Sequence, residues 1–179
     1  MKRDLSTIQN NLKNKKRKHN RHEYTDISPI TDKLFIGNKR IAKDIDKLKE
    51  HGITHVINCA VELEHYVEEY DNKSDKSIEW LWLPMYDCSF TGNVEDYIEE
   101  SIKFIDEALN NNNDNKILIH CAAGISRSSS ITIAYLMYKH NLRYERAFSR
   151  VVSKRSCCKP NSRFVEQLKG FDFTNLLNY

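Results

Sequence analysis

The sequence predicts one α/β domain with a central, mostly parallel sheet flanked by helices. Short apolar segments typical of strands alternate along the chain with segments whose apolar residues recur every three to four positions, as in amphipathic helices. Strands that alternate with helices favour parallel pairing, because each helix returns the chain to the same end of the sheet. The length of 179 residues suits a single domain.

The expected strands are short, apolar and rich in β-branched residues. They cover residues 34–37 (LFIG), 53–60 (ITHVINCA), 78–84 (IEWLWLP) and 116–120 (KILIH). Pro84 ends the third strand because proline cannot donate a backbone hydrogen bond. The fourth is apolar almost throughout, so we expect it in the centre of the sheet.

The expected helices cover residues 41–51, 93–109, 128–139, 143–155 and 161–171. In each of them the apolar residues follow helical spacing. Gly52 ends the first helix, as a residue that readily adopts positive φ often does. Asn93 is expected to cap the second helix, and the acidic residues Glu95 and Asp96 suit its positive end.

Charge divides the chain into a basic tail, residues 1–22, and a domain, residues 23–179. The tail has eight Lys or Arg residues and one Asp, which gives +7; because the whole chain carries +3, the domain carries −4. We expect a solvated tail that suits acidic partners, and nucleic acid is not the expected partner. An apolar stripe of Leu5, Ile8 and Leu12 offers the alternative of a docking helix, and with it a homodimer.

Composition argues against several classes of protein. No apolar run approaches the roughly 18–20 residues of a membrane span, and the N-terminus lacks the apolar stretch of a secretory signal. The five cysteines form no C-x-x-C pair, and the seven histidines do not join them at metal-ligand spacing. We therefore expect no metal and no cofactor, and a soluble protein in the cytoplasm or, given the basic tail, the nucleus.

The segment HCAAGISRS, residues 120–128, joins the end of the KILIH strand to a helix. Ligands of open α/β sheets bind at this edge, and a loop that enters a helix there presents N–H groups to an anion. Gly124 permits a tight turn, and Arg127 offers two donors to one phosphate. Such positive surroundings favour the thiolate form of Cys121. The segment therefore predicts nucleophilic attack on phosphorus by Cys121.

Cys121, five further residues and Arg127 together resemble the C-x-x-x-x-x-R signature of protein tyrosine phosphatases. HCAAGISRS, with AYLM at 134–137 and PNSRFVEQL at 160–168, is similar to the dual-specificity branch of that superfamily. The resemblance extends from about residue 27 to residue 168 and implies a phosphatase-like fold with residues 23–179 as the catalytic domain. The alternative is a structural cysteine beside a coincidental arginine, which the strand, loop and helix context disfavours.

The resemblance implies a role for most residues of this segment. Cys121 is the nucleophile, and Ser128 stabilises the departing thiolate when the phosphocysteine intermediate breaks down. Phosphate is bound by the backbone amides of Ala122, Ala123, Gly124, Ile125, Ser126 and Arg127, the last of which adds its side chain. His120 orients the cysteine, and Asn161 supports the phosphate loop. A helix cap explains Asn161 equally well, and a place in the core for His120 is compatible with its role.

The reaction also requires a proton donor for the leaving oxygen, and Asp87 in PMYDCSF is the predicted general acid. It follows the strand that ends at Pro84, on a loop at the edge where the phosphate loop lies. In the family an aspartate at this place gives a proton in the first step and takes one from water in the second. Asp96 is the rival, but its place in the first turn of a helix explains it without chemistry.

Cys59 is predicted as a redox partner of Cys121. Peroxide converts an open thiolate to sulfenic acid, which a neighbouring thiol can trap as a disulfide. Cys59 ends the strand ITHVINC at the same sheet edge, and neighbouring strands lie about 4.8 Å apart, within the range that a disulfide spans. Some phosphatases of the superfamily use a cysteine in the corresponding strand in this way. Cys88 is the rival, and a role as a small buried apolar residue is the other reading of Cys59.

The predicted function is hydrolysis of phosphotyrosine and of phosphoserine or phosphothreonine on proteins, through a phosphocysteine intermediate. The partner is then a phosphorylated protein, with a kinase as one option. Neutral Ala122, Ala123 and Ile125 disfavour the phosphoinositide branch of the superfamily, which has lysines in the loop. An RNA 5′-triphosphatase is a further alternative, favoured only by the basic tail. A phosphoprotein-binding pseudophosphatase, the alternative of a different class, is disfavoured because the cysteine, the arginine and the acid are all present.

Overall fold

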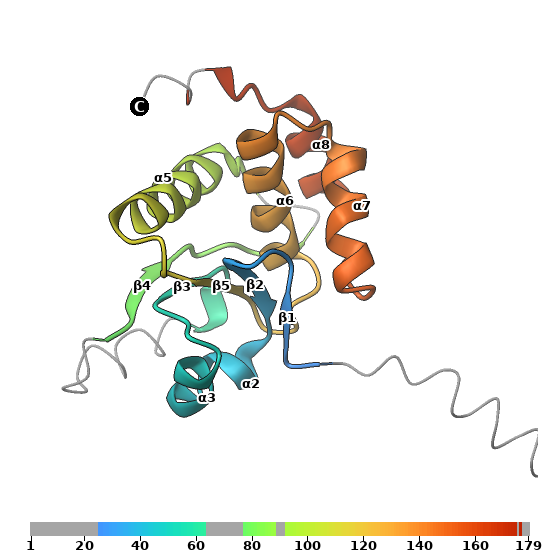
Figure 1. Ribbon diagram of the computed structural model, residues 1–179. Helices are drawn as coiled ribbons and strands as arrows, with labels where there is room; N and C mark the ends of the chain where they lie inside the picture. The colour runs from blue at the N-terminus through green and yellow to red at the C-terminus, as the bar shows by residue number, and fades with distance from the viewer. Residues whose placement is uncertain (1–24, 64–76, 89–91, 175, 177–179) are drawn as a thin grey trace, which may run out of the picture.

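The computed structural model describes residues 25–63, 77–88, 92–174 and 176. In this part of the chain a sheet of five strands carries helices on both faces (Figure 1). The strand order is β1-β2-β5-β3-β4, in which β1 is antiparallel to β2 and all other neighbours are parallel. The mostly parallel α/β sheet expected from the sequence is therefore present. The tail, residues 1–22, lies outside the described residues, so its boundary stays a prediction.

All four expected strands are found, and the structure adds one. The strands are β1 (Ile27–Pro29), β2 (Leu34–Gly37), β3 (His55–Asn58), β4 (Glu79–Trp82) and β5 (Ile117–His120). β5 lies in the centre, as expected. The added strand, β1, has three residues and contains a proline, so it is too short to show a pattern in the sequence.

The helices agree with the expected segments except at the first. They are α2 (Lys39–Ala42), α3 (Ile45–Glu50), the 3₁₀ helix η1 (Val61–Leu63), α5 (Glu95–Asn111), α6 (Arg127–His140), α7 (Tyr144–Lys154) and α8 (Ser162–Gly170). The single helix expected over residues 41–51 is wrong. Asp44 accepts a hydrogen bond from Lys47 N (3.1 Å) and so begins a second helix. The N-cap of α5 is Val94, although the Asn93 side chain still accepts from Glu95 N (3.1 Å).

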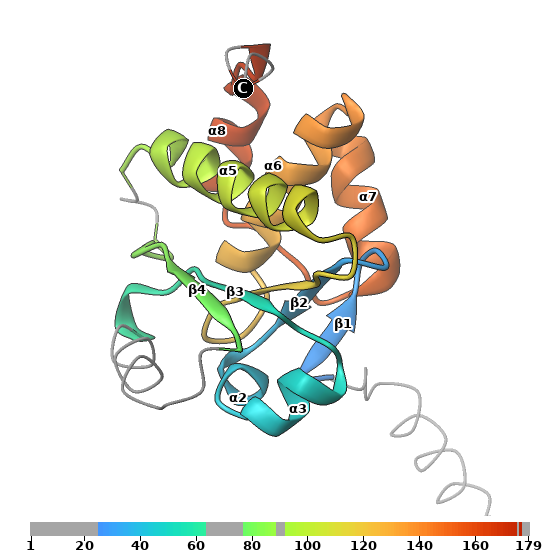
Figure 2. The ribbon, with the colours of Figure 1, turned by 60° about the vertical axis from the view of Figure 1, so that its left-hand side comes forward.

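Two layers of helices enclose the sheet (Figures 1 and 2). α5, α6, α7 and α8 cover one face, and α2 and α3 cover the other. Successive residues of a strand point to opposite faces, so β5 contributes to both cores. Ile117 and Ile119 pack in the larger core, and Leu118 packs in the smaller core with Phe35 and Leu48. β5 is therefore held from both sides, and the loop that follows it starts from a fixed position.

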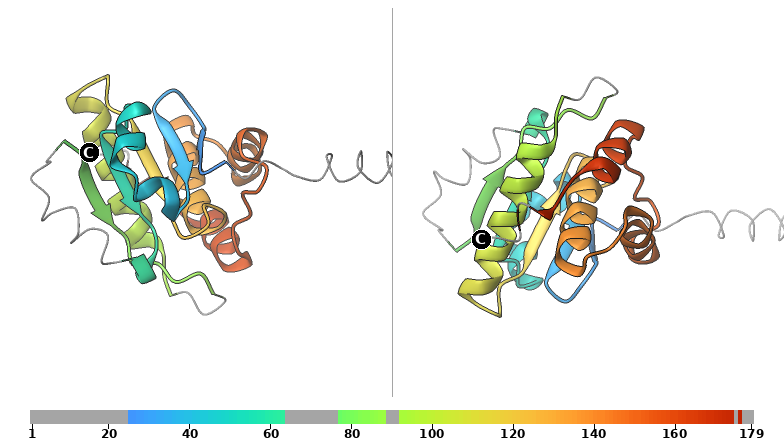
Figure 3. Two further views of the ribbon diagram at one scale, coloured as in Figure 1. Left: turned by 90° about the horizontal axis from the view of Figure 1, so that it is seen from below. Right: turned by 90° about the horizontal axis from the view of Figure 1, so that it is seen from above.

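The carboxyl ends of the four parallel strands lie at one edge of the sheet, so the segments that follow them meet there (Figure 3). His120 at the end of β5 is in register with Gly37 of β2 and Asn58 of β3. Ligands of parallel α/β sheets bind at such an edge. Among the described residues, no helix has the length and apolar character needed to cross a membrane.

Candidate active site

Residues 121–126 form a loop whose carbonyl groups are held by the surrounding structure. These hydrogen bonds are Lys39 N to Ala122 O (3.2 Å), Arg155 Nε to Gly124 O (2.9 Å) and Lys159 N to Ile125 O (2.9 Å). With these carbonyls turned outward, Gly124 N–H is turned inward and donates to Cys121 Sγ (3.2 Å). In the described part of the chain, no hydrogen-bond partner is found for the amides of Ala122, Ala123, Ile125 and Ser126. The loop thus offers several N–H groups to an anion.

Gly124 is required both by backbone conformation and by space. Its φ of 70° lies in the left-handed region, and a Cβ there would lie 2.5 Å from Gly37 O and 2.9 Å from Arg155 Nη2. Arg155 is buried and reaches from the end of α7 to β1 and the residues before it, where Nη1 donates to Thr25 O (2.8 Å) and to Ser28 Oγ of β1 (2.9 Å). These contacts of Arg155 could not be predicted from the sequence, because they join residues far apart in the chain.

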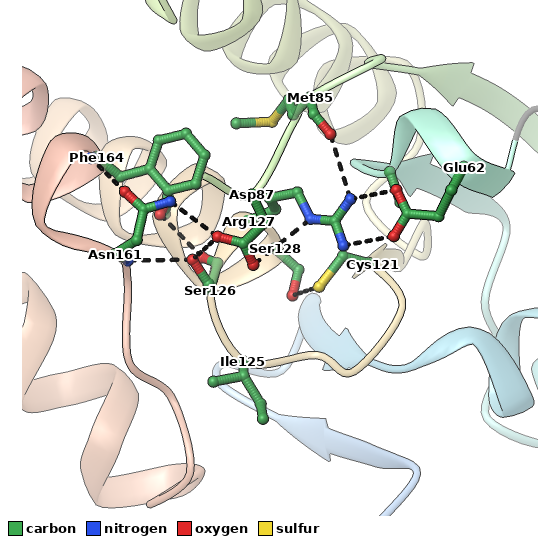
Figure 4. Close-up of polar contacts among 12 residues, drawn as sticks. Glu62, Met85, Asp87, Cys121, Ile125, Ser126, Arg127, Ser128, Asn161 and Phe164 are labelled. Atoms are coloured by element: carbon green, nitrogen blue, oxygen red, sulfur yellow. Dashed lines mark hydrogen bonds and ion pairs between the residues drawn. The ribbon is translucent and has the colours of Figure 1, made fainter. Parts of the chain in front are cut away.

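Cys121 lies at the base of this loop, directly after β5. Its side chain is almost fully buried, and Sγ lies 3.4 Å from Ser128 Oγ in the first turn of α6 (Figure 4). A hydroxyl, an amide N–H and a helix N-terminus therefore surround the sulfur. All three stabilise negative charge on it. The structure brings together Cys121 and Ser128, the predicted nucleophile and the residue predicted to assist its departure.

His120 occupies the last position of β5 and is completely buried. Its ring nitrogens have no hydrogen-bond partner among the described residues. Burial lowers the pKa of His120 to about 4, so the ring is neutral near neutral pH. Its carbonyl accepts from Cys59 N (2.8 Å) and helps to join β3 to β5. The backbone of Cys121 interacts with the His120 ring and opposes part of the fall in its pKa. The orientation of Cys121 by His120 stays a prediction.

Arg127 is the first residue of α6, and its guanidinium is oriented by contacts at one end. Nη1 and Nη2 donate to the two carboxylate oxygens of Glu62 (2.6 and 2.7 Å), and Nη1 also donates to Met85 O (3.2 Å) (Figure 4). The Nε–H and the second Nη2–H lie along the other edge. Nε is buried and has no hydrogen bond to any described residue. One edge of Arg127 is therefore available to two oxygens of a phosphate.

Glu62 is the residue that the sequence analysis missed. It lies in η1, 65 residues before Arg127 in the chain, and its side chain is half-exposed. Hydrogen bonds from Arg127 lower the pKa of Glu62. Burial opposes the charge of Arg127, but Glu62 and the negative charges of Cys121 and Asp87 outweigh it and raise the pKa of Arg127. The only available signal was a carboxylate placed just after the strand ITHVINCA, at the edge of the sheet.

Asp87 reaches the site from the segment after β4, and its two oxygens face different groups. Oδ1 accepts from Ser126 Oγ (2.8 Å) and from Asn161 Nδ2 (2.8 Å), whereas Oδ2 lies 3.8 Å from Arg127 Nε. Two donors already point at Oδ1, so the proton of a neutral Asp87 is favoured on Oδ2. Oδ2 is the oxygen that faces the free edge of Arg127. The carboxyl group is therefore oriented to exchange a proton with a molecule bound there.

Asn161 and Ser126 form the support of Asp87. Asn161 is the N-cap of α8, where Oδ1 accepts from Phe164 N (3.0 Å), and its backbone N–H donates to Ser126 Oγ (3.1 Å). Ser126 stands at the N-cap of α6, but its hydroxyl makes no cap bond and donates to Asp87. The two alternatives for Asn161, cap and support, are thus both present, and the support extends to the acid as well as to the loop.

Cys59 and Cys121 are the next residues after a registered pair, Asn58 with His120. Cys59 is fully buried, which raises the pKa of its thiol, and the negative charge of Cys121 raises it further. Burial also raises the pKa of Cys158 to about 12, with a smaller contribution from Cys121. Cys88, the rival named from the sequence, is exposed. Cys59 therefore has the expected position beside Cys121, and Cys158 is a second buried thiol near the site.

Residues 34–173 match the family described as dual specificity phosphatase, catalytic domain. The chain belongs to this family. Dual specificity protein phosphatase 1B of Arabidopsis thaliana is 36% identical over 148 residues, which cover 82% of each chain. Dual specificity protein phosphatase 6 of Homo sapiens is 36% identical over 141 residues, which cover 79% of this chain and 35% of that protein. The chain thus spans about a third of some relatives, and only 13% of protein phosphatase Slingshot of Drosophila melanogaster.

Solved structures confirm the predicted fold. The human tyrosine phosphatase-like serine/threonine/tyrosine-interacting protein superposes with a TM-score of 0.72 at 30% identity, over 84% of this chain and 97% of that one. DUSP15 gives a TM-score of 0.70 at 27% identity, over 83% and 88% of the two chains. The first of these proteins is named phosphatase-like, so the same fold occurs under different functional descriptions and catalysis depends on the residues of the site.

Proposed function

We propose that this chain hydrolyses phosphotyrosine and phosphoserine or phosphothreonine on proteins through a phosphocysteine intermediate. Membership of the dual-specificity phosphatase family supports dephosphorylation of proteins. The observation that carries the proposal is the orientation of Arg127, whose unbonded Nε lies 3.8 Å from Asp87 Oδ2 and whose guanidinium interacts with the charges of both Cys121 and Asp87. A phosphate bound at the Nε edge of Arg127 would have the nucleophile and the acid within reach.

In the first step, the Cys121 thiolate attacks phosphorus and the bond from phosphorus to the ester oxygen breaks. The amides of the loop and the free edge of Arg127 hold the other phosphate oxygens. Asp87 gives the proton on Oδ2 to the departing oxygen, so an alcohol or phenol leaves and no alkoxide forms. The products of this step are the dephosphorylated side chain, the phosphocysteine and an ionised Asp87.

In the second step, a water molecule attacks the phosphocysteine. Asp87, now ionised, takes a proton from this water, and the bond between sulfur and phosphorus breaks. The Ser128 hydroxyl and the Gly124 N–H, which lie 3.4 and 3.2 Å from Sγ, stabilise the departing thiolate. Phosphate is released, and both Cys121 and Asp87 return to their starting protonation states.

The neutral side chains of the loop favour a protein substrate. Ala122, Ala123 and Ile125 add no positive charge, and Arg127 is partly neutralised by Glu62. A phosphoinositide or a 5′-triphosphate carries several further negative charges that would meet no cation in this loop. A monophosphorylated protein, with a kinase as one option, is therefore the proposed substrate.

Hydrolysis of p-nitrophenyl phosphate, followed in wild type and in Cys121→Ser, tests the proposal. Wild type should turn over, and the variant should lose at least about a thousandfold of the rate, because the nucleophile is absent. Arg127→Lys separates the effect of charge from that of geometry in phosphate binding. It keeps the positive charge but removes the pair of N–H donors, Nε–H and Nη2–H, that can bind two phosphate oxygens. Tight phosphopeptide binding without turnover in wild type would instead indicate a pseudophosphatase. Faster turnover of a phosphoinositide or an RNA 5′-triphosphate than of any phosphopeptide would overturn the protein substrate.

The proposal includes a location in the cytoplasm or nucleus and self-association through residues 1–22. The basic charge of this segment and its stripe of Leu5, Ile8 and Leu12 support these two points. Cell fractionation tests the first. Light scattering of the full chain and of a chain that lacks residues 1–22 tests the second. A monomer in both cases would contradict self-association.

A further inference from the structure

We infer that one exposed side of α7 is a docking surface for an acidic segment of the phosphoprotein substrate. This inference rests on the proposed function, because it assigns a partner to the same site. The surface is the basic row, defined as Arg143, Arg146, Arg150 and Lys154. All four side chains are exposed. Their spacing of three, four and four residues places them on one side of the helix.

The basic row lacks the neutralising partners that neighbouring helices have. Within the described residues, none of its four members forms an ion pair, whereas Lys139, Arg163 and Lys169 are each paired with a carboxylate at 2.7 to 2.9 Å. Glu145 is the one acidic residue of α7, and its ion pair is with Lys169 of α8 (2.7 Å). The positive charge of the row is therefore directed to solvent.

This arrangement is unfavourable for the helix itself. Arg146 and Arg150, and likewise Arg150 and Lys154, are like charges four residues apart, which destabilises a helix. Arg143 and Arg146 also lie at the N-terminal end of α7, where the helix dipole disfavours positive charge. Within the described part of the chain, the one favourable interaction found for these four side chains is that of Arg143 with the charge of Glu145, which already pairs with Lys169. An external anionic partner would offset the unfavourable interactions.

The basic row ends at the phosphate loop. Arg155 follows Lys154 and donates from Nε to Gly124 O (2.9 Å), and Lys159 N donates to Ile125 O (2.9 Å). A substrate with its phosphate in the loop would thus have adjacent residues within reach of positive charge.

The chemistry of α7 favours an acidic polypeptide over RNA or a membrane. The apolar residues Tyr144, Ala147 and Val151 are buried against the domain, so α7 presents no apolar face to lipid. The one large hydrophobic side chain exposed among the described residues is Tyr86, which lies beside Asp87 and not on α7. Aromatic side chains on which bases could stack are thus not exposed on this helix. α7 is about 16 Å long, which matches about five residues of extended peptide.

The test compares two phosphotyrosine peptides that differ only in a flank of five Glu or five Gln residues. Wild type should show a KM about threefold to tenfold lower for the Glu peptide, and the difference should shrink in high salt. Arg150→Glu should lose this preference. The matched control is Lys103→Glu, which makes the same change of charge at an exposed position of α5, on the other side of α6 (Figure 1). It should keep the preference.

Turnover of p-nitrophenyl phosphate should be equal in these three proteins. Arg150→Glu should not melt earlier than wild type, because the new carboxylate would have a cation four residues away on either side, Arg146 and Lys154. Equal loss of preference in Lys103→Glu would overturn the inference, since it would indicate an effect of net charge alone. No preference in wild type, or tighter binding of single-stranded RNA or phosphatidylserine vesicles that Arg150→Glu abolishes, would overturn it too. If wild type lacks turnover, the proposed function fails, and peptide affinity measured by fluorescence anisotropy decides the docking surface separately.

Discussion

The two sides of the site are held in different ways. The phosphate loop follows β5, which is buried on both faces, and its carbonyls are fixed by bonds from α2, Arg155 and Lys159. Asp87, in contrast, lies beyond the end of β4, is one-third exposed, and is oriented by polar contacts with Ser126 and Asn161. The position of Cys121 and its loop is thus fixed by the core, whereas the position of Asp87 is fixed by a few hydrogen bonds at the surface. We call these the loop side and the acid side.

This difference fits what the proposed reaction requires of the loop and of the acid. The loop has to bind the same phosphate group in every substrate, so a rigid, preorganised site is favourable. In the proposed mechanism, Asp87 has to reach leaving oxygens of different side chains and must change its protonation state in each turnover. Changes on the acid side should therefore alter the dependence on the leaving group, and changes on the loop side should alter phosphate binding or folding stability.

The largest effect is expected for Asp87→Asn with a poor leaving group. Hydrolysis of phenyl phosphate should fall by roughly a hundredfold to ten-thousandfold, because the departing oxygen then receives no proton. Cleavage of a substrate with a very good leaving group should lose much less, since that group departs without protonation. Rates measured over a series of aryl phosphates give the comparison. An equal loss for all substrates would contradict the acid role of Asp87.

Burial of His120 at the end of β5 should make the folding stability depend on pH. The pKa of His120 is about 4 in the folded chain because of burial, whereas an unfolded histidine titrates near about 6.5. Between these values the unfolded chain binds more protons, so the stability that is present above about pH 6.5 is lost as the pH falls. We expect a loss of about 2 kcal/mol from His120 between about pH 7 and about pH 4.5. Urea unfolding of wild type and His120→Gln measures it.

The pKa of His55 is also lowered by burial, so the wild-type loss contains more than one contribution. The informative quantity is the difference between the two proteins. Identical pH dependence would contradict the burial of a neutral His120. Should the variant not fold, the midpoint of the His120 ring signals in NMR decides the question, and a midpoint near about 6.5 would be the contradicting value.

Glu62→Gln should weaken phosphate binding by about fivefold to tenfold in KM, with a smaller change in kcat. Glu62 holds the end of Arg127, and its neutral replacement cannot accept from both Nη atoms, so the free edge loses its fixed direction. Inhibition by inorganic phosphate should weaken by the same factor. Glu79→Gln is a matched control, because Glu79 is an exposed residue of β4. A normal phosphate affinity in Glu62→Gln would show that Arg127 needs no such support.

Asn161→Ser should lower the rate of phenyl phosphate hydrolysis by about fivefold, a smaller effect than those above. Serine can still cap α8 but cannot donate to Asp87 Oδ1, so the acid loses one of its two orienting bonds. The loss should be greatest for phenyl phosphate and smallest for good leaving groups, as for Asp87→Asn. A purely structural role would lower all rates alike and also lower the melting temperature.

Cys59→Ser should have the smallest effect on activity, and only after treatment with peroxide. In wild type, peroxide should convert Cys121 to a sulfenic acid, and the Cys59 thiol should then displace water to form a disulfide. Dithiothreitol should restore this form, whereas Cys59→Ser should be inactivated irreversibly at a peroxide dose about threefold lower. Cys158→Ser is the control, since Cys158 is another buried thiol near the site. Equal recovery in Cys59→Ser, or Cys121 joined to Cys88 or Cys158 by mass spectrometry, would contradict the assignment.

The phosphate loop could be predicted because its signal is local. A strand, a glycine that must adopt positive φ and an arginine at the start of a helix lie close together in the chain, and the structure places Cys121, Ser128 and Arg127 together as expected. Asp87 could be placed because it follows a strand parallel to β5, so that both strands end at the same side of the sheet. The hydrogen bond from Ser126 to Asp87 could not be predicted, because a serine before a helix ordinarily indicates a helix cap.

Long-range polar contacts account for most of what the sequence did not predict. The contact between Glu62 and Arg127 joins residues 65 positions apart, and Arg155 reaches Thr25 over 130 positions. Such pairs leave no periodic pattern in the sequence. Any exposed carboxylate at the carboxyl ends of the strands was an equally good candidate for the partner of Arg127. The division of residues 41–51 into two helices was missed for another reason. Apolar spacing continues through Asp44, while the cap that interrupts it depends on one side chain.

Trapping of the phosphocysteine is the most direct test of Cys121 as the nucleophile. Ser128→Ala should slow the second step more than the first, because the hydroxyl 3.4 Å from Sγ no longer stabilises the departing thiolate. Acid quenching of this variant during turnover of p-nitrophenyl phosphate, followed by peptide mapping, should find about one phosphoryl group per chain on Cys121. Continued turnover with no phosphorylated cysteine, or a phosphoryl group on any residue other than Cys121, would contradict it.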